Sequence, residues 1–139
     1  MTIKLASLKV DLEREETGDW IEFPEWPGVD FNVSSIHKPA YVLARDVLLQ
    51  RLARQHKGKP VPVTVTSPQI GKLYATHLLH GWRGLDVEYS PETALETLSD
   101  PAFRAIVNAV EYCAGQVSAI DAEYMDDAEG NSAAPSGTK

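Results

Sequence analysis

Two histidines are the residues that could most readily bind a metal. His77 and His80 are three apart in a segment whose apolar spacing predicts a helix, so both would point to one side. A zinc site needs a third and usually a fourth ligand, and the spacing selects neither Cys113 nor Asp86. The patterns HExxH and CxxC are absent. We therefore interpret His77 as packing on an apolar face and His80 as standing at a helix end, where a positive charge is favourable. A small metal-dependent enzyme using both histidines remains an alternative.

The single cysteine is the other candidate for chemistry. Cys113 falls on the apolar stripe of the last predicted helix, whereas a nucleophile needs an exposed, electropositive setting and a base. We predict that it is a core residue. The patterns GxxxxGK[ST], GxSxG and GxGxxG are absent as well. These observations favour a protein that is not an enzyme and needs no cofactor.

The stretch HGWRGL, residues 80–85, has a tryptophan and an arginine between two glycines. Gly81 follows an apolar-periodic helix predicted over 68–80, so it suits a left-handed helix cap. Trp82 would bury a large area at the turn, and Gly84 would let the chain pass close to another segment. We predict a helix–turn–helix joint fixed by Trp82.

Residues 3–33 have a β pattern. Apolar residues alternate with charged ones in LKVDLERE, Gly18 suits a hairpin turn, and WIEF and VDFNV predict two further strands. After residue 33 the period changes to that of a helix. One helix opens at Pro39 and ends near Gly58, and KPVPVTVT after it is predicted to be extended. Three more helices are each expected to start at a capping residue followed by proline: Ser67-Pro68, Ser90-Pro91 and Asp100-Pro101.

The last of these helices should run to about Tyr124, with Gly115 inside it marking a close contact. The predicted class is therefore α+β: an N-terminal β-hairpin or small antiparallel sheet followed by about four helices. Residues 1–125 would form a single domain. Residues 126–139 lack large apolar side chains, which predicts a disordered polar tail.

The charge of the chain bounds its partners. The formal net charge is −7 over 139 residues, which argues against nucleic-acid binding. No segment has the pattern of a signal peptide or a membrane span, so we expect a reducing cytoplasm and no membrane contact. Charge is also segregated: residues 11–30 hold eight acids and one arginine, and residues 38–59 hold six cations and one acid.

This segregation suggests self-association, in which the basic helix of one copy meets the acidic hairpin of the next in a ring or helical array. The alternative is that the two segments face each other within one molecule or are solvated surfaces. The residues proposed for contact with a second copy or a partner are Arg45, Arg51, Arg54, Lys57, Glu15, Glu16, Trp20 and Trp26.

The chain has an ordered set of motifs: GDWIEF, PGVDFNV, KPAY, LLHGWRGL, YSPETALETLSDPAF, AIVNAVEYCAG and GNSAAPSG. Their order resembles that of the tail assembly chaperones of long-tailed, siphovirus-type bacteriophages and prophages. The resemblance covers most of residues 8–136, and its sharpest part is GWRGL followed by the two capped prolines. Family members often carry an arginine after the strand that matches VDFNV, where this chain has Ser34 and Ser35.

The resemblance implies a non-enzymatic role in viral tail assembly. Such chaperones bind the tape-measure protein, recruit tail-tube subunits in the host cytoplasm, and are absent from the mature virion. In many relatives a translational frameshift makes a second, longer product, to which a polar tail could be a tether. The alternative within this setting is another phage structural component, such as a neck or tail-completion protein.

Overall fold

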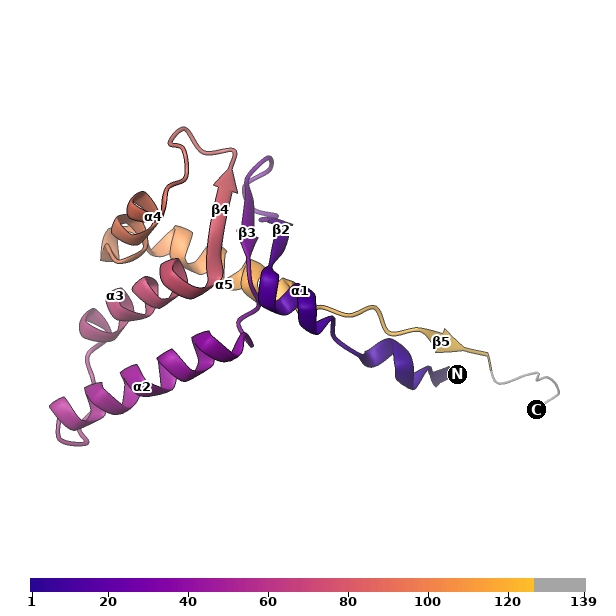
Figure 1. Ribbon diagram of the computed structural model, residues 1–139, viewed down its shortest axis with the longest axis horizontal. Helices are drawn as coiled ribbons and strands as arrows, with labels where there is room; N and C mark the ends of the chain where they lie inside the picture. The colour runs from indigo at the N-terminus through magenta and orange to yellow at the C-terminus, as the bar shows by residue number, and fades with distance from the viewer. Residues whose placement is uncertain (127–139) are drawn as a thin grey trace. The chain divides into compact units, whose positions relative to one another are not determined.

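The computed structural model describes residues 1–126, which fall into two compact units (Figure 1). We call Leu12–Ser118 the body unit, and Met1–Asp11 together with the chain from Ala119 onward the terminal unit. Apart from Asp126, the polar tail predicted over 126–139 lies outside the described residues. None of the helices in residues 1–126 has the length and apolar character needed to span a bilayer.

The body unit is built on a three-stranded antiparallel sheet. Its strands are β2 (Asp19–Glu22), β3 (Asp30–Val33) and β4 (Leu79–Arg83), in the spatial order β2-β3-β4. The alternation in VDFNV has the predicted result, because Phe31 and Val33 are fully buried. Phe31 is opposite Ile21 on one side and Trp82 on the other. The central strand therefore carries the apolar face on which the helices pack.

The helices of the body unit are α1 (Leu12–Thr17), α2 (Pro39–Gln55), α3 (Val63–Leu73), α4 (Pro91–Leu98) and α5 (Arg104–Gln116). Helix α5 packs against β2 and β3, and α2 contacts α3 (Figure 1). The buried face of α5 includes Val110 and Cys113, as its apolar spacing predicts. The predicted α+β class, with a small antiparallel sheet and several helices, is confirmed.

Several predicted helix boundaries are confirmed by their caps. Pro39 is the first residue of α2, and Gly58 lies just beyond its end with a φ of +77°. The side chain of Ser90 accepts a hydrogen bond from the backbone N–H of Thr93 at the start of α4. Asp100 caps the short 3₁₀ turn η3 (Pro101–Phe103), which leads into α5.

The strand predicted from LKVDLERE is wrong. The structure has a 3₁₀ turn η1 (Leu5–Leu8) and then α1, and the alternating Leu8, Val10 and Leu12 are all exposed. The segment from Leu12 to Glu16 consists of strong helix formers, with acids in the first turn where the helix dipole favours them. Helix propensity therefore outweighs the two-residue period here.

The helix start predicted at Ser67-Pro68 is also wrong. Helix α3 begins at Val63, so the VTVT run expected to be extended is helical and Pro68 lies inside the helix. Pro62 precedes the first turn with a φ of −59°, and its carbonyl accepts hydrogen bonds from Val65 and Thr66. Packing fixes the rest, because a Cβ at Gly71 would lie 1.8 Å from the carbonyl oxygen of Leu98 in α4. Close contact between α3 and α4 overrides the β-branched composition.

The helix–turn–helix joint predicted at HGWRGL is wrong in kind. After α3 the chain makes one π-helical turn, η2 (Tyr74–Leu78), and passes directly into β4. Gly81 and Trp82 thus lie in a strand, and Gly81 is not among the glycines with positive φ. The burial of Trp82 is confirmed, as is the close approach at Gly84. Gly84 has a φ of +93°, and a Cβ there would lie 2.2 Å from the oxygen of Gly28.

The last helix is shorter than predicted. Helix α5 ends at Gln116, and Tyr124 belongs to β5 (Tyr124–Met125), which pairs with β1 (Thr2–Ile3) in the terminal unit. The close contact predicted at Gly115 is wrong, because a Cβ there would meet nothing within 4 Å. Val117, just after α5, is still buried, but the apolar residues beyond it, such as Ile120, are exposed. They lack the core that a longer amphipathic helix would need.

Candidate protein-docking pocket

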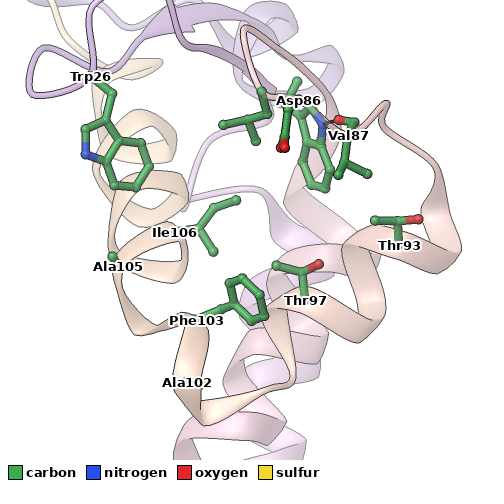
Figure 2. Close-up of a pocket in the computed structure, with 11 residues that line it drawn as sticks. Trp26, Asp86, Val87, Thr93, Thr97, Ala102, Phe103, Ala105 and Ile106 are labelled. Atoms are coloured by element: carbon green, nitrogen blue, oxygen red, sulfur yellow. Dashed lines mark hydrogen bonds between the residues drawn. The ribbon is translucent and has the colours of Figure 1, made fainter.

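The body unit has an apolar pocket of about 350 Å³ where four segments meet (Figure 2). These segments are the β2–β3 loop, the end of β4 with the loop after it, α4, and η3 with the start of α5. Figure 2 shows Trp26 on one side and Asp86 and Val87 on the other, with Ile106 and Phe103 between them. The lining residues are Trp26, Trp82, Leu85, Asp86, Val87, Thr93, Thr97, Ala102, Phe103, Ala105 and Ile106.

Trp82 organises the wall of this pocket. It is buried, and its indole Nε1–H donates a hydrogen bond of 2.8 Å to the carbonyl oxygen of Val87. Its ring meets Tyr89 edge to face, with the centroids 5.3 Å apart. The hydroxyl of Tyr89 donates in turn to the carbonyl of Leu79. The loop after β4 is therefore held to the strand by two aromatic side chains.

The rim of the pocket is apolar and exposed. Phe103 and Val87 each leave about half of their surface in contact with solvent. Trp26 is partly buried and packs edge to face on Phe23, with centroids 4.9 Å apart. Asp86 supplies a carboxylate among the lining residues. Large exposed apolar side chains around a preformed hollow are typical of sites that take apolar side chains from a ligand or a protein partner.

Two helix caps position this rim. The Ser90 cap starts α4, from which Thr93 and Thr97 reach the pocket. The Asp100 cap, in which the N–H of Ala102 donates to Oδ1 at 2.9 Å, starts the turn that presents Phe103. The capping residues Ser90 and Asp100, each followed by a proline, therefore shape the pocket as well as the helical turns that they start.

A second group of polar side chains lies between α1, β3, β4 and α5. Ser34 is fully buried, and its hydroxyl donates to the carbonyl of Glu16 at 2.9 Å. Because that hydroxyl has one proton, it accepts from Nε2–H of His80, 2.6 Å away. Burial lowers the pKa of His80, and the nearby charge of Lys38 lowers it further. A serine that is fully buried and already donating is a structural tie, since a nucleophile must be accessible.

The neighbouring serine belongs to a second tie. The Ser35 and Ser118 hydroxyls are hydrogen-bonded, and Ser118 donates to Oε2 of Glu15 at 2.6 Å. Glu15 is itself buried. The position where the tail chaperones often have an arginine is thus used here to fasten α1 to the end of α5.

These ties correct part of the predicted contact surface. Glu15 is not available to a partner, because it is buried and hydrogen-bonded within the molecule. Glu16 is exposed and lies 3.8 Å from the ammonium group of Lys38, an ion pair between the acidic and the basic segment. Trp20 is stacked under the guanidinium of Arg83, 4.2 Å from the ring centre.

Glu16 and Trp20 are exposed, and the remaining predicted contact residues are also accessible, at least in part. Trp26 is at the rim of the pocket. Arg51, Arg54 and Lys57 are exposed along α2 and just beyond its end. Arg45 is partly buried, 5.9 Å from the ring centre of Tyr41.

The candidate metal ligands are not brought together. His80 lies in β4 and not at a helix end, so the favourable position predicted for its charge is wrong. His77 lies in the π-helical turn, where its carbonyl accepts from the side chain of Lys38. Within residues 1–126, no group of three or more His, Cys, Asp or Glu side chains is placed to hold a metal ion.

Cys113 is buried as predicted. Burial, aided by the charge of Asp30, raises the pKa of its thiol to about 11. The thiol is therefore protonated at neutral pH and unsuited to nucleophilic attack.

Comparison with known protein families assigns the chain to a family of prophage proteins. A family model described as YdaY prophage protein matches residues 36–131, more than half of the chain. The chain belongs to the YdaY prophage protein family. No curated protein and no solved structure matches it. The match to the YdaY family begins after β3, so it includes the α4 and α5 side of the pocket but not Trp26.

Proposed function

We propose that this YdaY-family protein is a tail assembly chaperone. In this non-enzymatic role it binds the tape-measure protein, recruits tail-tube subunits in the host cytoplasm, and is absent from the mature virion. The proposal rests on membership of a prophage family together with the ordered motifs shared with tail chaperones. The single structural observation that supports it is the exposed apolar pocket between β4, α4 and α5.

The tape-measure protein of long-tailed phages is a long helical chain. The pocket has room for an apolar side chain from one helix of that protein. An amphipathic helix presents apolar side chains three or four residues apart to a groove. Phe103 and Val87 would lose their exposed surface on binding, and each apolar side chain buried contributes roughly 1.5–3 kcal/mol. Asp86 would select for a cation beside the anchor.

Pull-down of the tape-measure protein encoded in the same prophage tests the proposal. The full-length chain should retain it, and Phe103→Glu should weaken retention at least about tenfold, because a carboxylate would be desolvated in the pocket. Leu95→Glu is the matched control: Leu95 is exposed to a similar degree on α4 but does not line the pocket. Equal retention by Phe103→Glu and the unaltered chain would contradict the assigned site.

Mass spectrometry of purified virions distinguishes a chaperone from a structural component such as a neck or tail-completion protein. A chaperone should be absent from particles, and deletion of its gene should abolish assembled tails. Recovery of the chain at a fixed copy number per virion would instead identify a neck or tail-completion protein.

A further inference from the structure

The terminal unit exposes nearly all of its large apolar side chains. Leu5 is 80% exposed and Tyr124 is 60% exposed, and Ile3, Ile120 and Met125 are also classed as exposed. Its ladder has two residues in each strand, with Thr2 opposite Met125 and Ile3 opposite Tyr124. A two-stranded ladder is marginal in water unless an apolar face is covered. The described part of this unit therefore has strands but no core of its own.

Polar bonds hold the two halves of the terminal unit together. The N–H of Lys4 donates to the carbonyl of Glu123 at 2.7 Å, and the N–H of Glu123 donates to the hydroxyl of Ser7 at 2.8 Å. The side chains of Lys4 and Glu123 are 3.3 Å apart. These bonds define one arrangement of the unit and leave its apolar side chains for another surface.

The body unit has an apolar groove, several of whose lining side chains are exposed in the part of the chain that the structure describes. It lies between α2 and α3 and has a volume of about 530 Å³. Leu43 and Val47 on α2 are 66% and 54% exposed at this groove. Arg51 and Lys72 line it as well, so the apolar surface carries positive charge at its edge.

The charges of the two surfaces are complementary. Residues 120–126 read IDAEYMD, with three acids and no lysine or arginine, and each apolar side chain has a carboxylate within two positions. The segment containing α2, residues 38–59, holds six cations and one acid. An apolar strand with acidic neighbours is the ligand that an apolar groove with basic edges would select.

We propose that the terminal unit of one copy docks, through Ile120, Tyr124 and Met125, into the α2–α3 groove of a second copy. Asp121 and Asp126 then face Arg51 and Lys72 of that copy. This assignment replaces the acidic segment 11–30 as the partner of the basic helix, since Glu15 of that segment lies in α1 and is buried. Because each copy has one terminal unit and one groove, the contact is heterologous and generates rings or open helical arrays.

Sedimentation velocity of the full-length chain over a range of concentrations tests the proposal. The unaltered chain should assemble beyond a dimer at low salt, and added salt should weaken assembly as the charges are screened. Tyr124→Glu and Val47→Glu should each raise the dissociation constant about tenfold or more, because each places a carboxylate in the apolar contact. Leu49→Glu is the matched control on α2, because Leu49 is exposed but does not line the groove.

Mixing Tyr124→Glu with Val47→Glu tests whether the contact joins a terminal unit to a groove. The Tyr124→Glu copy keeps its groove and the Val47→Glu copy keeps its terminal unit, so an equimolar mixture should form dimers and nothing larger. Loss of assembly in Tyr124→Glu with none in Val47→Glu would show instead that terminal units pair with each other. A chain that stays monomeric at low salt and about 1 mM, where even weak contacts are populated, would overturn the proposal. Phe103→Glu should assemble normally, so failure of the client site and of this contact are distinguishable.

Discussion

Phe31, Val33 and Leu78 of the body unit are fully buried, whereas Leu5 and Tyr124 of the terminal unit are largely exposed. The two units have similar apolar residue types and differ in what surrounds those residues. In the body unit, strands and helices bury one continuous cluster that includes Trp82 and Val110. In the terminal unit, short strands are joined by polar bonds. The difference shows that apolar composition alone does not make a core: several elements must be long enough to enclose it.

The largest effect is expected at the wall of the pocket. Trp82→Ala should lower the free energy of unfolding by roughly 3–5 kcal/mol, because it empties a buried site and removes the donor to Val87. Trp20→Ala is the control and should cost less than about 1 kcal/mol, since the Trp20 ring is exposed beneath Arg83. Urea denaturation followed by circular dichroism measures both. Equal losses would show that Trp82 does not anchor the body unit.

Alanine substitutions at two glycines should have opposite effects, because Gly71 lies in close contact with α4 and a Cβ at Gly115 would meet nothing within 4 Å. Gly71→Ala should destabilise by about 1–3 kcal/mol, because its Cβ would meet the Leu98 carbonyl at 1.8 Å and the backbones of α3 and α4 must move apart. Gly115→Ala should instead stabilise by about 0.5–1 kcal/mol, since its Cβ enters open space within a helix. Thermal denaturation of both variants measures the contrast. A stabilising Gly71→Ala would refute the close helix contact.

A pH effect should be found in the body unit. The pKa of His80 lies below its usual value of 6.5 because of burial and the charge of Lys38. Between the lowered pKa of the folded state and the usual pKa of the unfolded state, the unfolded chain binds more protons than the folded one. The contribution of His80 to the free energy of unfolding therefore falls as pH falls through this window. Above the usual pKa the contribution is fully present. His80→Gln should therefore give a shallower decline in stability below about pH 6.5. Denaturation midpoints across this range measure it, and an unchanged slope would assign the decline to other groups.

The smallest effect is expected in the terminal unit. Tyr124→Glu should change the free energy of unfolding by less than about 0.5 kcal/mol under conditions where the chain is monomeric, because Tyr124 is exposed. The same denaturation measurement at low protein concentration tests this. A loss comparable to that of Trp82→Ala would mean that the stability of the body unit depends on this residue.

The parts of the fold that local chemistry determines were predictable from the sequence. Ser90-Pro91 and Asp100-Pro101 cap helical turns because a side-chain oxygen and a preset φ act on neighbouring residues. The alternation in VDFNV identified a strand whose alternate residues are buried. Signals of this kind need no information from distant parts of the chain.

The error at LKVDLERE was local, but several others arose where distant residues decide the structure. Trp82 lies in a strand because it pairs with Phe31, and nothing beside it in the sequence indicates that partner. Val63 starts a helix whose close contact with α4 involves Leu98. Of the candidate site, Trp26 was predicted to be a partner contact, and it lies at the pocket rim. Phe103 was not predicted to be a contact residue, because the pocket exists only when four separate segments meet.

The pairing of β1 with β5 also sets an order of events during synthesis. Residues 2–3 leave the ribosome near the start of translation, and their partner strand at residues 124–125 is made near the end of the described chain. At about 5–20 residues per second, roughly 6–24 s separate the two, and β1 has no partner strand during that time. The tie between Glu15 and Ser118 must wait in the same way. A nascent chain therefore lacks the ladder until residue 125 has been translated.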